Sequence, residues 1–411
     1  MDRPRRSFRT DFLALAGALG LSALAVAFLF WLSAAPDDYS GRMIVRFEGK
    51  PPTLEAVQRI IDSGATPVRA MPFISAWVVR AEAGSVPALK AQGVTCIIIS
   101  HKLGEVRYVA DTVTVIRDGM TVSTLDTKTG LSEDRIVRDM VGRDMTHRFP
   151  EHVRRPGEVL MEVEGWNAWH PEHADRQVIR NVSFTVRRGE VVGVAGLMGS
   201  GRTELAMSIF GRSYGRNISG TVRIGGKPVD VSTVDRAIDA GVSYVTEDRK
   251  SLGLVLDETI RFNTTLANLR DVSAGGVLNR NEETRVAEKY RDALAIRTPS
   301  VFQKTVNLSG GNQQKVVLAK WLNTTPEILI LDEPTRGIDV GAKYEIYTII
   351  NKLAAEGKGV VMISSEMPEL IGMCDRIYVM SEGSLVGELS AADATQERIM
   401  SLIVNEQGVE A

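Results

Sequence analysis

The chain has 411 residues, enough for two or three domains, and a formal net charge of −2 at pH 7. This charge balance excludes the broad basic face of a nucleic-acid-binding protein, so we expect no nucleic-acid partner. Cys96 and Cys374 lie in apolar contexts and the five histidines show no ligand spacing, which excludes a disulfide framework or a cysteine–histidine metal site.

The first feature along the chain is an apolar run without charge, FLALAGALGLSALAVAFLFWL, at residues 12–32. It is long enough to span a bilayer as a helix. Four arginines precede it, and Asp37 and Asp38 follow it, so the positive-inside bias places the N-terminus in the cytoplasm. We expect residues 1–38 to be a tail with an uncleaved transmembrane helix; a cleaved secretory signal or a buried core helix is the alternative.

Residues 39–93 predict a small α/β unit. RMIVRF alternates like a strand, and TLEAVQRIIDSG reads as an amphipathic helix ending on Gly64. The segment ATPVRAMPFISAWVVRAE reads as two strands with a break between them near Met71 and Pro72. SVPALKAQG is a second helix, so the order is that of a βαββα half of a ferredoxin-like unit. No catalytic constellation occurs in it, and its role stays open.

An internal repeat begins next. CIIISHKLGEVRYVADTVTVIRDG, from Cys96, parallels VMISSEMPELIGMCDRIYVMSEG, from Val361, and places His101 on Ser365. Duplicated units indicate the architecture of a chain. The first copy, within residues 94–150, should not fold stably alone; packing on residues 40–93, with residues 96–99 continuing their sheet, is the alternative.

A longer domain, residues 151–411, begins with a polar, turn-rich linker at residues 154–157 that precedes its core. In it, GLMGSGRT at residues 196–203 follows the strand EVVGVA and precedes the helical run ELAMSIFG, the context of a phosphate-binding loop. Thr203 is placed to ligate Mg²⁺. Arg202 stands where the pattern has lysine, and its planar fork is expected to alter the phosphate geometry. A glycine turn in a Rossmann-like unit is the alternative.

Two further motifs lie close together downstream. LSGGNQQKVVLAKWL, from Leu308, is a glycine-rich turn that opens a helix, and the N–H groups of such a helix start point at an anion. ILILDEPTRGID, from Ile328, is an apolar strand ending in two carboxylates. Asp332 is suited to holding Mg²⁺, and Glu333 to orienting a water molecule.

These motifs, with VTEDRKSLGL and VMISSEMPEL, resemble the second nucleotide-binding domain in the duplicated ATPase subunit of bacterial monosaccharide ABC importers of the ribose, xylose and multiple-sugar type. The resemblance covers nearly all of residues 151–411 and most of 94–150. It implies an α/β P-loop NTPase fold, ATP and Mg²⁺ as cofactors, and ATP hydrolysis that powers sugar import.

The resemblance also implies roles for particular residues. Catalysis would use Glu333, Asp332 and Ser365, with His101 as the switch residue of the first copy, and Thr203 and Asp332 would hold the metal. The phosphate-loop contacts to nucleotide would come from Gly196, Gly199, Ser200, Gly201, Arg202 and Thr203. The signature residues Ser309, Gly310 and Gly311 would contact a nucleotide held by the opposite domain.

Three other positions are assigned by the same resemblance. Glu247 stands where the family commonly has a glutamine that touches Mg²⁺, although a solvated turn carboxylate is the alternative. Trp169 is placed to stack on adenine, unless it is an ordinary surface or core tryptophan. Asp339 lies in the loop that crosses the dimer seam in the family.

The implied partners are a membrane permease, a second ATPase domain and, indirectly, a periplasmic sugar-binding protein. The ATPase region would lie on the cytoplasmic side of the inner membrane, in conflict with an N-terminus-in anchor. We therefore interpret the chain as a fusion, joined near residues 88–94, of an anchored fragment and a truncated, inactive ATPase subunit. A nucleotide-binding module that does not hydrolyse ATP, or an anchored sensor built on residues 40–93, is the alternative. The sequence does not specify the sugar.

Overall fold

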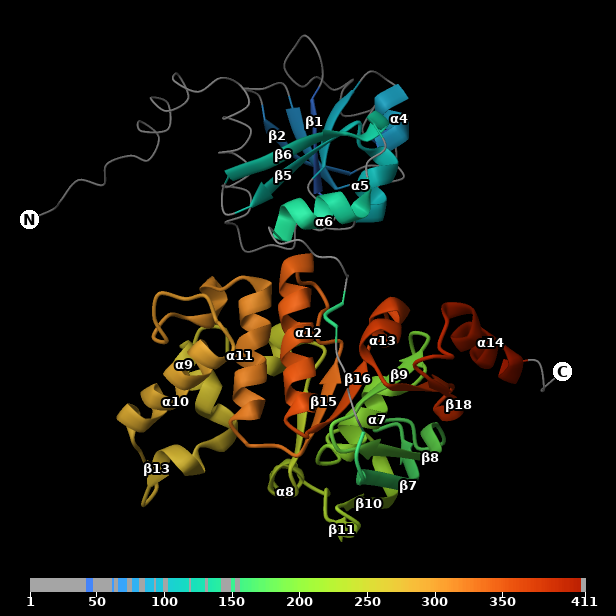
Figure 1. The fold of residues 1–411 in the computed structure, drawn as a ribbon, viewed down its shortest axis with the longest axis vertical. Helices are drawn as coiled ribbons and strands as arrows, with labels where there is room; N and C mark the ends of the chain where they lie inside the picture. Colours follow the sequence, from blue (N-terminus) through green and yellow to red (C-terminus); the bar gives the residue numbers. More distant parts are fainter. Residues whose placement is uncertain are drawn as a thin grey trace, which may run out of the picture. The chain divides into compact units, whose positions relative to one another are not determined.

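The computed structural model describes a chain of two units, residues 1–145 and 146–411 (Figure 1). The described residues are 42–46, 61–62, 66–71, 76–80, 86–91, 94–98, 103–117, 120–129, 132–141, 149–151 and 156–407. Within these ranges no helix is long and apolar enough to cross a bilayer. The apolar run 12–32 and His101 lie outside them.

The first unit contains an antiparallel sheet of order β2-β3-β1-β4. Its elements are β1 (Arg42–Arg46), β2 (Thr66–Met71), β3 (Ala76–Arg80), α4 (Val86–Ala91) and β4 (Thr95–Ile98). Residues 61–62 are helical, so the order is βαββαβ, the connectivity of a ferredoxin-like unit. The half unit expected from residues 39–93 is thus completed by β4, which pairs with β1 from Met43↔Ile98 to Arg46↔Thr95.

The first copy of the repeat continues after β4. Its elements are α5 (Leu103–Val109), β5 (Thr112–Arg117), β6 (Met120–Asp126), the 3₁₀ turn η3 (Thr127–Thr129) and α6 (Glu133–Val141). Val113, Val115 and Ile136 form a small buried core between the hairpin and α6. Lys90 of α4 pairs with Asp111 at 2.7 Å and donates to the carbonyl of Val109, so α4 is joined to this copy.

Removal of residues 1–93 should make residues 94–141 sensitive to protease. The truncation removes β1, the strand that pairs with β4, and Lys90, the partner of Asp111 in an ion pair. It leaves an unpaired strand edge and uncovered apolar side chains. Limited proteolysis with mass spectrometry measures the cleavage rate in each segment. Lys90→Ala in the full chain is the control and should change little, because an exposed ion pair contributes little stability. Equal resistance of residues 94–141 and 156–407 in the truncated chain would contradict this prediction.

The second unit is built on a six-stranded sheet of order β12-β15-β16-β9-β17-β18. The first five strands in this order are parallel, and β18 is antiparallel to β17. The strands are β9 (Val191–Gly196), β12 (Val242–Val245), β15 (Ile328–Asp332), β16 (Gly359–Ile363), β17 (Arg376–Ser381) and β18 (Ser384–Ser390).

A second, antiparallel sheet has the order β11-β10-β7-β8. Its strands are β7 (Val159–Trp169), β8 (Gln177–Arg187), β10 (Arg216–Ile224) and β11 (Lys227–Val229). A separate short hairpin joins β13 (Ser273–Ala274) to β14 (Val277–Leu278).

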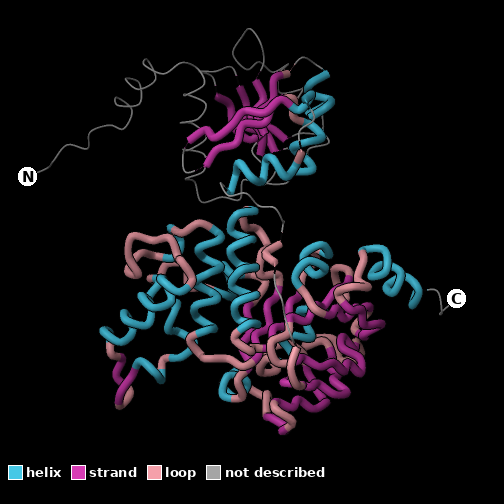
Figure 2. The backbone as a smooth tube through the Cα atoms, viewed as in Figure 1, coloured by secondary structure: helices cyan, strands magenta, loops and turns pink. Residues whose placement is uncertain are grey.

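Helices surround these sheets, with α9, α10 and α11 gathered on one side of the unit and the second sheet on the other (Figures 1 and 2). The helices are α7 (Arg202–Ile209), α8 (Val234–Asp239), α9 (Ile260–Thr265), α10 (Arg280–Ala293), α11 (Gly310–Leu322), α12 (Val340–Ala355), α13 (Met367–Met373) and α14 (Gln396–Gln407). Shorter turns are the π-helical η4 (Arg249–Gly253) and the 3₁₀ turns η5 (Leu266–Asn268), η6 (Arg270–Val272) and η7 (Thr305–Asn307).

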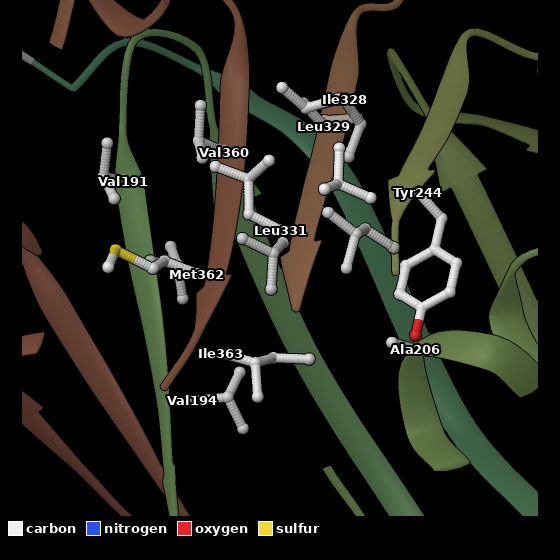
Figure 3. Close-up of a cluster of buried hydrophobic side chains, with 14 of the residues drawn as sticks. Val191, Val194, Ala206, Tyr244, Ile328, Leu329, Leu331, Val360, Met362 and Ile363 are labelled. Atoms are coloured by element: carbon white, nitrogen blue, oxygen red, sulfur yellow. The ribbon is translucent and has the colours of Figure 1, made fainter. Parts of the chain in front are cut away.

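The central strands β9, β15 and β16 are buried at every position. Their sequences VVGVAG, ILILD and GVVMI are nearly continuous apolar runs, as expected for parallel strands covered on both faces. Figure 3 shows Val191, Leu331 and Met362 in the cluster of apolar side chains that these strands contribute. The carboxyl ends of the three neighbouring parallel strands lie at one edge of this rigid sheet, and each carries a polar segment.

Lys320 is a buried cation in α11. Its side chain is 6% exposed, and its Nζ donates to the carbonyl of Gly253 at 2.5 Å and lies 4.9 Å from the centre of the Trp321 ring. No carboxylate pairs with it in the described part of the chain. Burial lowers its pKa from 10.5 to about 8.

The buried lysine predicts a particular dependence of stability on pH. Between about pH 8 and 10.5 the unfolded chain binds more protons than the folded chain, so the free energy of unfolding rises with pH in this window. The full shift corresponds to about 3 kcal/mol. Urea unfolding between pH 7 and 10.5 should show this rise in the wild type and its loss in Lys320→Met. The exposed Lys289, which also lies over a tyrosine ring, supplies the control variant Lys289→Met. Parallel profiles for the wild type and Lys320→Met would refute the assignment.

Candidate nucleotide-binding site

The glycine loop connects β9 to α7. Gly199 and Gly201 have φ values of 82° and 101°, in the left-handed region that favours glycine. At Gly196 a Cβ would lie 2.5 Å from the carbonyl oxygen of Met380 and from Ser200 Oγ, so only glycine fits there. The loop therefore depends on its glycines, and it leads into a helix start that no side chain caps. Free N–H groups at such a start can bind phosphate oxygens.

Arg202 is the first residue of α7 and is 9% exposed. Its Nη1 donates to the carbonyl of Ser364 at 2.7 Å. Burial lowers the pKa of the guanidinium, and the nearby carboxylates of Glu333 and Asp332 oppose this change. The arginine at the expected lysine position thus connects the phosphate loop with the chain that follows β16.

Asp332 ends β15 and is fully buried. Its Oδ2 accepts a hydrogen bond from the Tyr244 hydroxyl at 2.9 Å. Burial raises its pKa, while hydrogen bonds from Thr203 and Tyr244 and the charge of Arg202 act in the opposite direction. Its Oδ1 is buried without a hydrogen-bond partner among the described residues, as is Ser200 Oγ. An unsatisfied carboxylate oxygen beside a threonine hydroxyl is a set of oxygen donors that fits Mg²⁺.

Glu333 follows with a φ of 48°, a strained conformation for a residue other than glycine. Its N–H donates to the carbonyl of Ile363 at 2.9 Å, and its Oε2 accepts from Ser365 Oγ at 3.2 Å. Burial raises its pKa, with the Ser365 hydrogen bond and Arg202 opposing. The ends of β15 and β16 therefore hold a partly desolvated carboxylate that can accept a hydrogen bond from water.

The signature residues lie against the N-terminus of α12. Ser309 is the N-cap position of α11, and a Cβ at Gly311 would lie 2.4 Å from the Ala342 Cβ. Asp339 caps α12, its Oδ1 accepting from the Ala342 N–H at 2.9 Å. The structure therefore packs Ser309, Gly310 and Gly311 beside the turn that carries Asp339. It brings Arg202, Thr203, Asp332, Glu333 and Ser365 together as a separate group.

Glu247, predicted to contact Mg²⁺, and Trp169, predicted to stack on adenine, both contact other residues in the structure. The Glu247 carboxylate pairs with the Arg336 guanidinium. Trp169 ends β7, is half-buried, and pairs across the sheet with Gln177 and Arg216. Their roles in nucleotide binding stay predictions.

Sequence reasoning missed three residues at this site: Tyr244, Ser364 and Glu369. Glu369 is 1% exposed and accepts from Ser364 Oγ at 2.8 Å and from Tyr347 Oη at 2.5 Å. Burial acts to raise the pKa of Glu369, but Lys343 and the neighbouring hydroxyls hold this pKa below the ordinary value. One signal was present, because the internal repeat aligns Glu105 with Glu369. Tyr244 gave none, since a tyrosine in an apolar strand is commonplace.

The chain is similar in sequence to known proteins. Residues 179–336 match the family model described as ABC transporter. The L-arabinose transport ATP-binding protein AraG of Geobacillus stearothermophilus is 59% identical over 77% of this chain and 62% of its own length. The xylose import ATP-binding protein XylG of Thermoanaerobacter pseudethanolicus is 51% identical over 76% and 61%. The ribose import ATP-binding protein RbsA of Bacillus licheniformis is 46% identical over 78% and 63%.

The chain thus spans about three fifths of the length of these relatives. Among solved structures, a nucleotide-free ATP-binding cassette from an ABC transporter has a TM-score of 0.51 and 21% identity. The comparison covers 62% of this chain and 98% of that one, and it shows the fold alone.

Proposed function

We propose that the chain binds ATP with Mg²⁺ as the ATP-binding component of a monosaccharide importer, because residues 179–336 match the ABC transporter family model and the fold is that of an ATP-binding cassette. The observation that carries this proposal is the meeting of phosphate loop, buried aspartate and strained glutamate at one sheet edge. β15, β16 and β9 are adjacent and parallel, so Asp332 at the end of β15 lies beside the segments after β16 and β9 that carry Ser365 and Arg202. Ligands of open α/β sheets bind at this edge.

In this proposal each group has a defined task. The loop amides, the N-terminus of α7 and Arg202 bind the phosphates, and Thr203 and Asp332 hold the metal. Bound Mg²⁺ would neutralise charge on the phosphoryl oxygens. Glu333 orients the attacking water, with Ser365 fixing the carboxylate at 3.2 Å. Trp169 stacks on adenine.

The proposal includes partners and a location. Ser309, Gly310 and Gly311 serve a nucleotide held by a second ATPase domain, and a permease and a periplasmic sugar-binding protein complete the importer at the cytoplasmic face of the inner membrane. Relatives named for arabinose, xylose and ribose support a monosaccharide cargo. The first repeat copy lacks its own phosphate loop, so we expect the chain to turn over ATP slowly by itself and to be inactive in import alone.

A second candidate function is nucleotide binding without hydrolysis. The bond of Arg202 to the Ser364 carbonyl favours it, because this guanidinium must leave its partner before it can reach a phosphate. ATP turnover by the full chain, alone and with an intact first domain added, distinguishes the two functions. Uptake of labelled monosaccharide in a strain without the importer's ATPase tests the transport role.

Thr203→Ala should weaken Mg²⁺-dependent ATP binding by roughly tenfold or more, because a metal ligand is lost. Binding of a fluorescent ATP analogue to the full chain, with Mg²⁺ and with EDTA, measures the effect. The matched control is Thr348→Ala, on the exposed face of α12. Wild-type affinity of Thr203→Ala in the presence of Mg²⁺ would argue against this site.

A further inference from the structure

Glu247 and Arg249 contact the same short segment, which follows Glu333 in the chain. Arg249 Nη1 donates to the carbonyl of Arg336 at 2.7 Å, and its Nη2 donates to the carbonyl of Gly337 at 3.2 Å. The Glu247 carboxylate pairs with the guanidinium of Arg336. Both the backbone and the side chain of this segment are therefore held by two residues of one loop.

The signature residues Ser309, Gly310 and Gly311, called the signature turn below, lie beside this segment. A Cβ at Gly310 would be 2.9 Å from Arg249 Nη2 and 3.3 Å from the carbonyl oxygen of Gly337. Gly310 therefore leaves room for the guanidinium, and the absence of a side chain there brings α11 close to residues 336–337. Three segments meet at Arg249: its own loop, the chain after Glu333 and the signature turn.

The loop that carries Arg249 is itself fixed at both ends. Asp248 caps η4, its Oδ1 accepting from the N–H groups of Lys250 at 2.9 Å and Ser251 at 3.0 Å. At the other end, the carbonyl of Gly253 accepts from Lys320 of α11. Arg249 thus lies on a turn that hydrogen bonds hold at both ends, which suits a group that positions other segments.

We propose that Glu247 and Arg249 are positioning residues, a tether that sets the 333–339 loop against the signature turn, and that Glu247 is not a metal ligand. The inference rests on the proposed function, because the tethered loop begins at Glu333 and ends at Asp339. Glu333 serves the chain's own nucleotide, whereas Ser309, Gly310 and Gly311 serve the nucleotide of a second domain. The tether connects the two sites within one domain.

The tether should act on turnover and leave nucleotide affinity unchanged. The hydrogen bonds of Arg249 go to residues 336 and 337, and the phosphate loop lies elsewhere. Arg336 is 62% exposed and Glu247 34%, so their ion pair contributes little to folding. Misplacement of a reacting group by about 1 Å, by contrast, lowers kcat strongly.

A charge exchange tests the pairing of Glu247 with Arg336. Glu247→Arg and Arg336→Glu should each lower kcat of the full chain about tenfold at unchanged KM, and the double variant should recover to within about threefold of wild type. If Glu247 ligates Mg²⁺ instead, the double variant will stay as slow as Glu247→Arg, and the Mg²⁺ concentration for half-maximal binding will rise. That result would overturn the proposal.

Hydrogen exchange supplies a readout that needs no hydrolysis. In Arg249→Ala the amides of residues 337–343 should exchange about tenfold faster than in wild type, and Arg249→Lys should recover part of this protection. Arg297→Ala is the matched control, because Arg297 is an exposed arginine that pairs with Glu345 of α12. Faster exchange in Arg249→Ala, together with no ATP turnover by the wild-type chain, would support the tether and contradict the proposed ATPase function. Unchanged exchange and unchanged kcat in an active chain would remove the tether.

Discussion

Glu333→Gln is expected to lower ATP turnover by about two to three orders of magnitude. The amide keeps the size of the side chain and can still accept from Ser365 Oγ, but it loses the negative charge that orients and polarises the attacking water. ATP–Mg²⁺ affinity should stay within about twofold, since Thr203 and Asp332 keep their places. Phosphate release at saturating ATP and a separate binding titration measure the two quantities.

The control for this change is Glu356→Gln, an exposed carboxylate at the end of α12. It should leave both turnover and affinity at the wild-type level. Equal kcat in wild type and Glu333→Gln would mean that Glu333 only stabilises the turn in which it adopts a φ of 48°.

Arg376→Ala should lower the free energy of unfolding of the second unit by about 3–5 kcal/mol. The Arg376 guanidinium binds both oxygens of Glu190, with Nε at 2.7 Å and Nη2 at 3.1 Å. Nη1 also donates to Glu388 at 2.8 Å. Glu190 is 1% exposed, so removal of the arginine leaves a buried carboxylate without its counter-charge. Burial acts to lower the pKa of Arg376, but the hydrogen bonds to Glu190 and Glu388 raise this pKa above its ordinary value.

Urea unfolding followed by circular dichroism measures this effect. Glu388→Gln is the control, because Glu388 is 47% exposed and its loss should cost less than about 1 kcal/mol. Arg376→Ala and Glu388→Gln of equal stability would show that the pair with Glu190 is not the main stabilising contact.

The sequence predicts the central strands and the phosphate loop because their causes are local. Apolar runs such as ILILD need two covered faces, and the turns at residues 199 and 201 need left-handed backbone that glycine adopts readily. The sequence predicts the completion of a ferredoxin-like sheet by residues 96–99 only as an alternative. It depends on β4, whose short apolar stretch does not by itself indicate a partner strand.

The contacts between loops could not be predicted for a different reason. The replacement of lysine by Arg202 is plain in the sequence, but its bond to the Ser364 carbonyl joins residues far apart in the chain. The same holds for Glu247 and Arg336, which different strands of the sheet carry to one place. Such pairs follow from the packing of the whole domain, so a motif assigns Glu247 a position but not a partner.

The pairing of β4 with β1 has a consequence for fragment complementation. In the second copy of the repeat the equivalent strand, β16, lies between two parallel neighbours, β15 and β9. In the first copy the same pattern is bonded antiparallel to β1 through the pairs from Met43↔Ile98 to Arg46↔Thr95. One strand cannot take both sets of neighbours along the same edge. The remainder of the proposed first ATPase domain, supplied from outside, would therefore compete with β1 for residues 95–98, and its association should become tighter when β1 is removed.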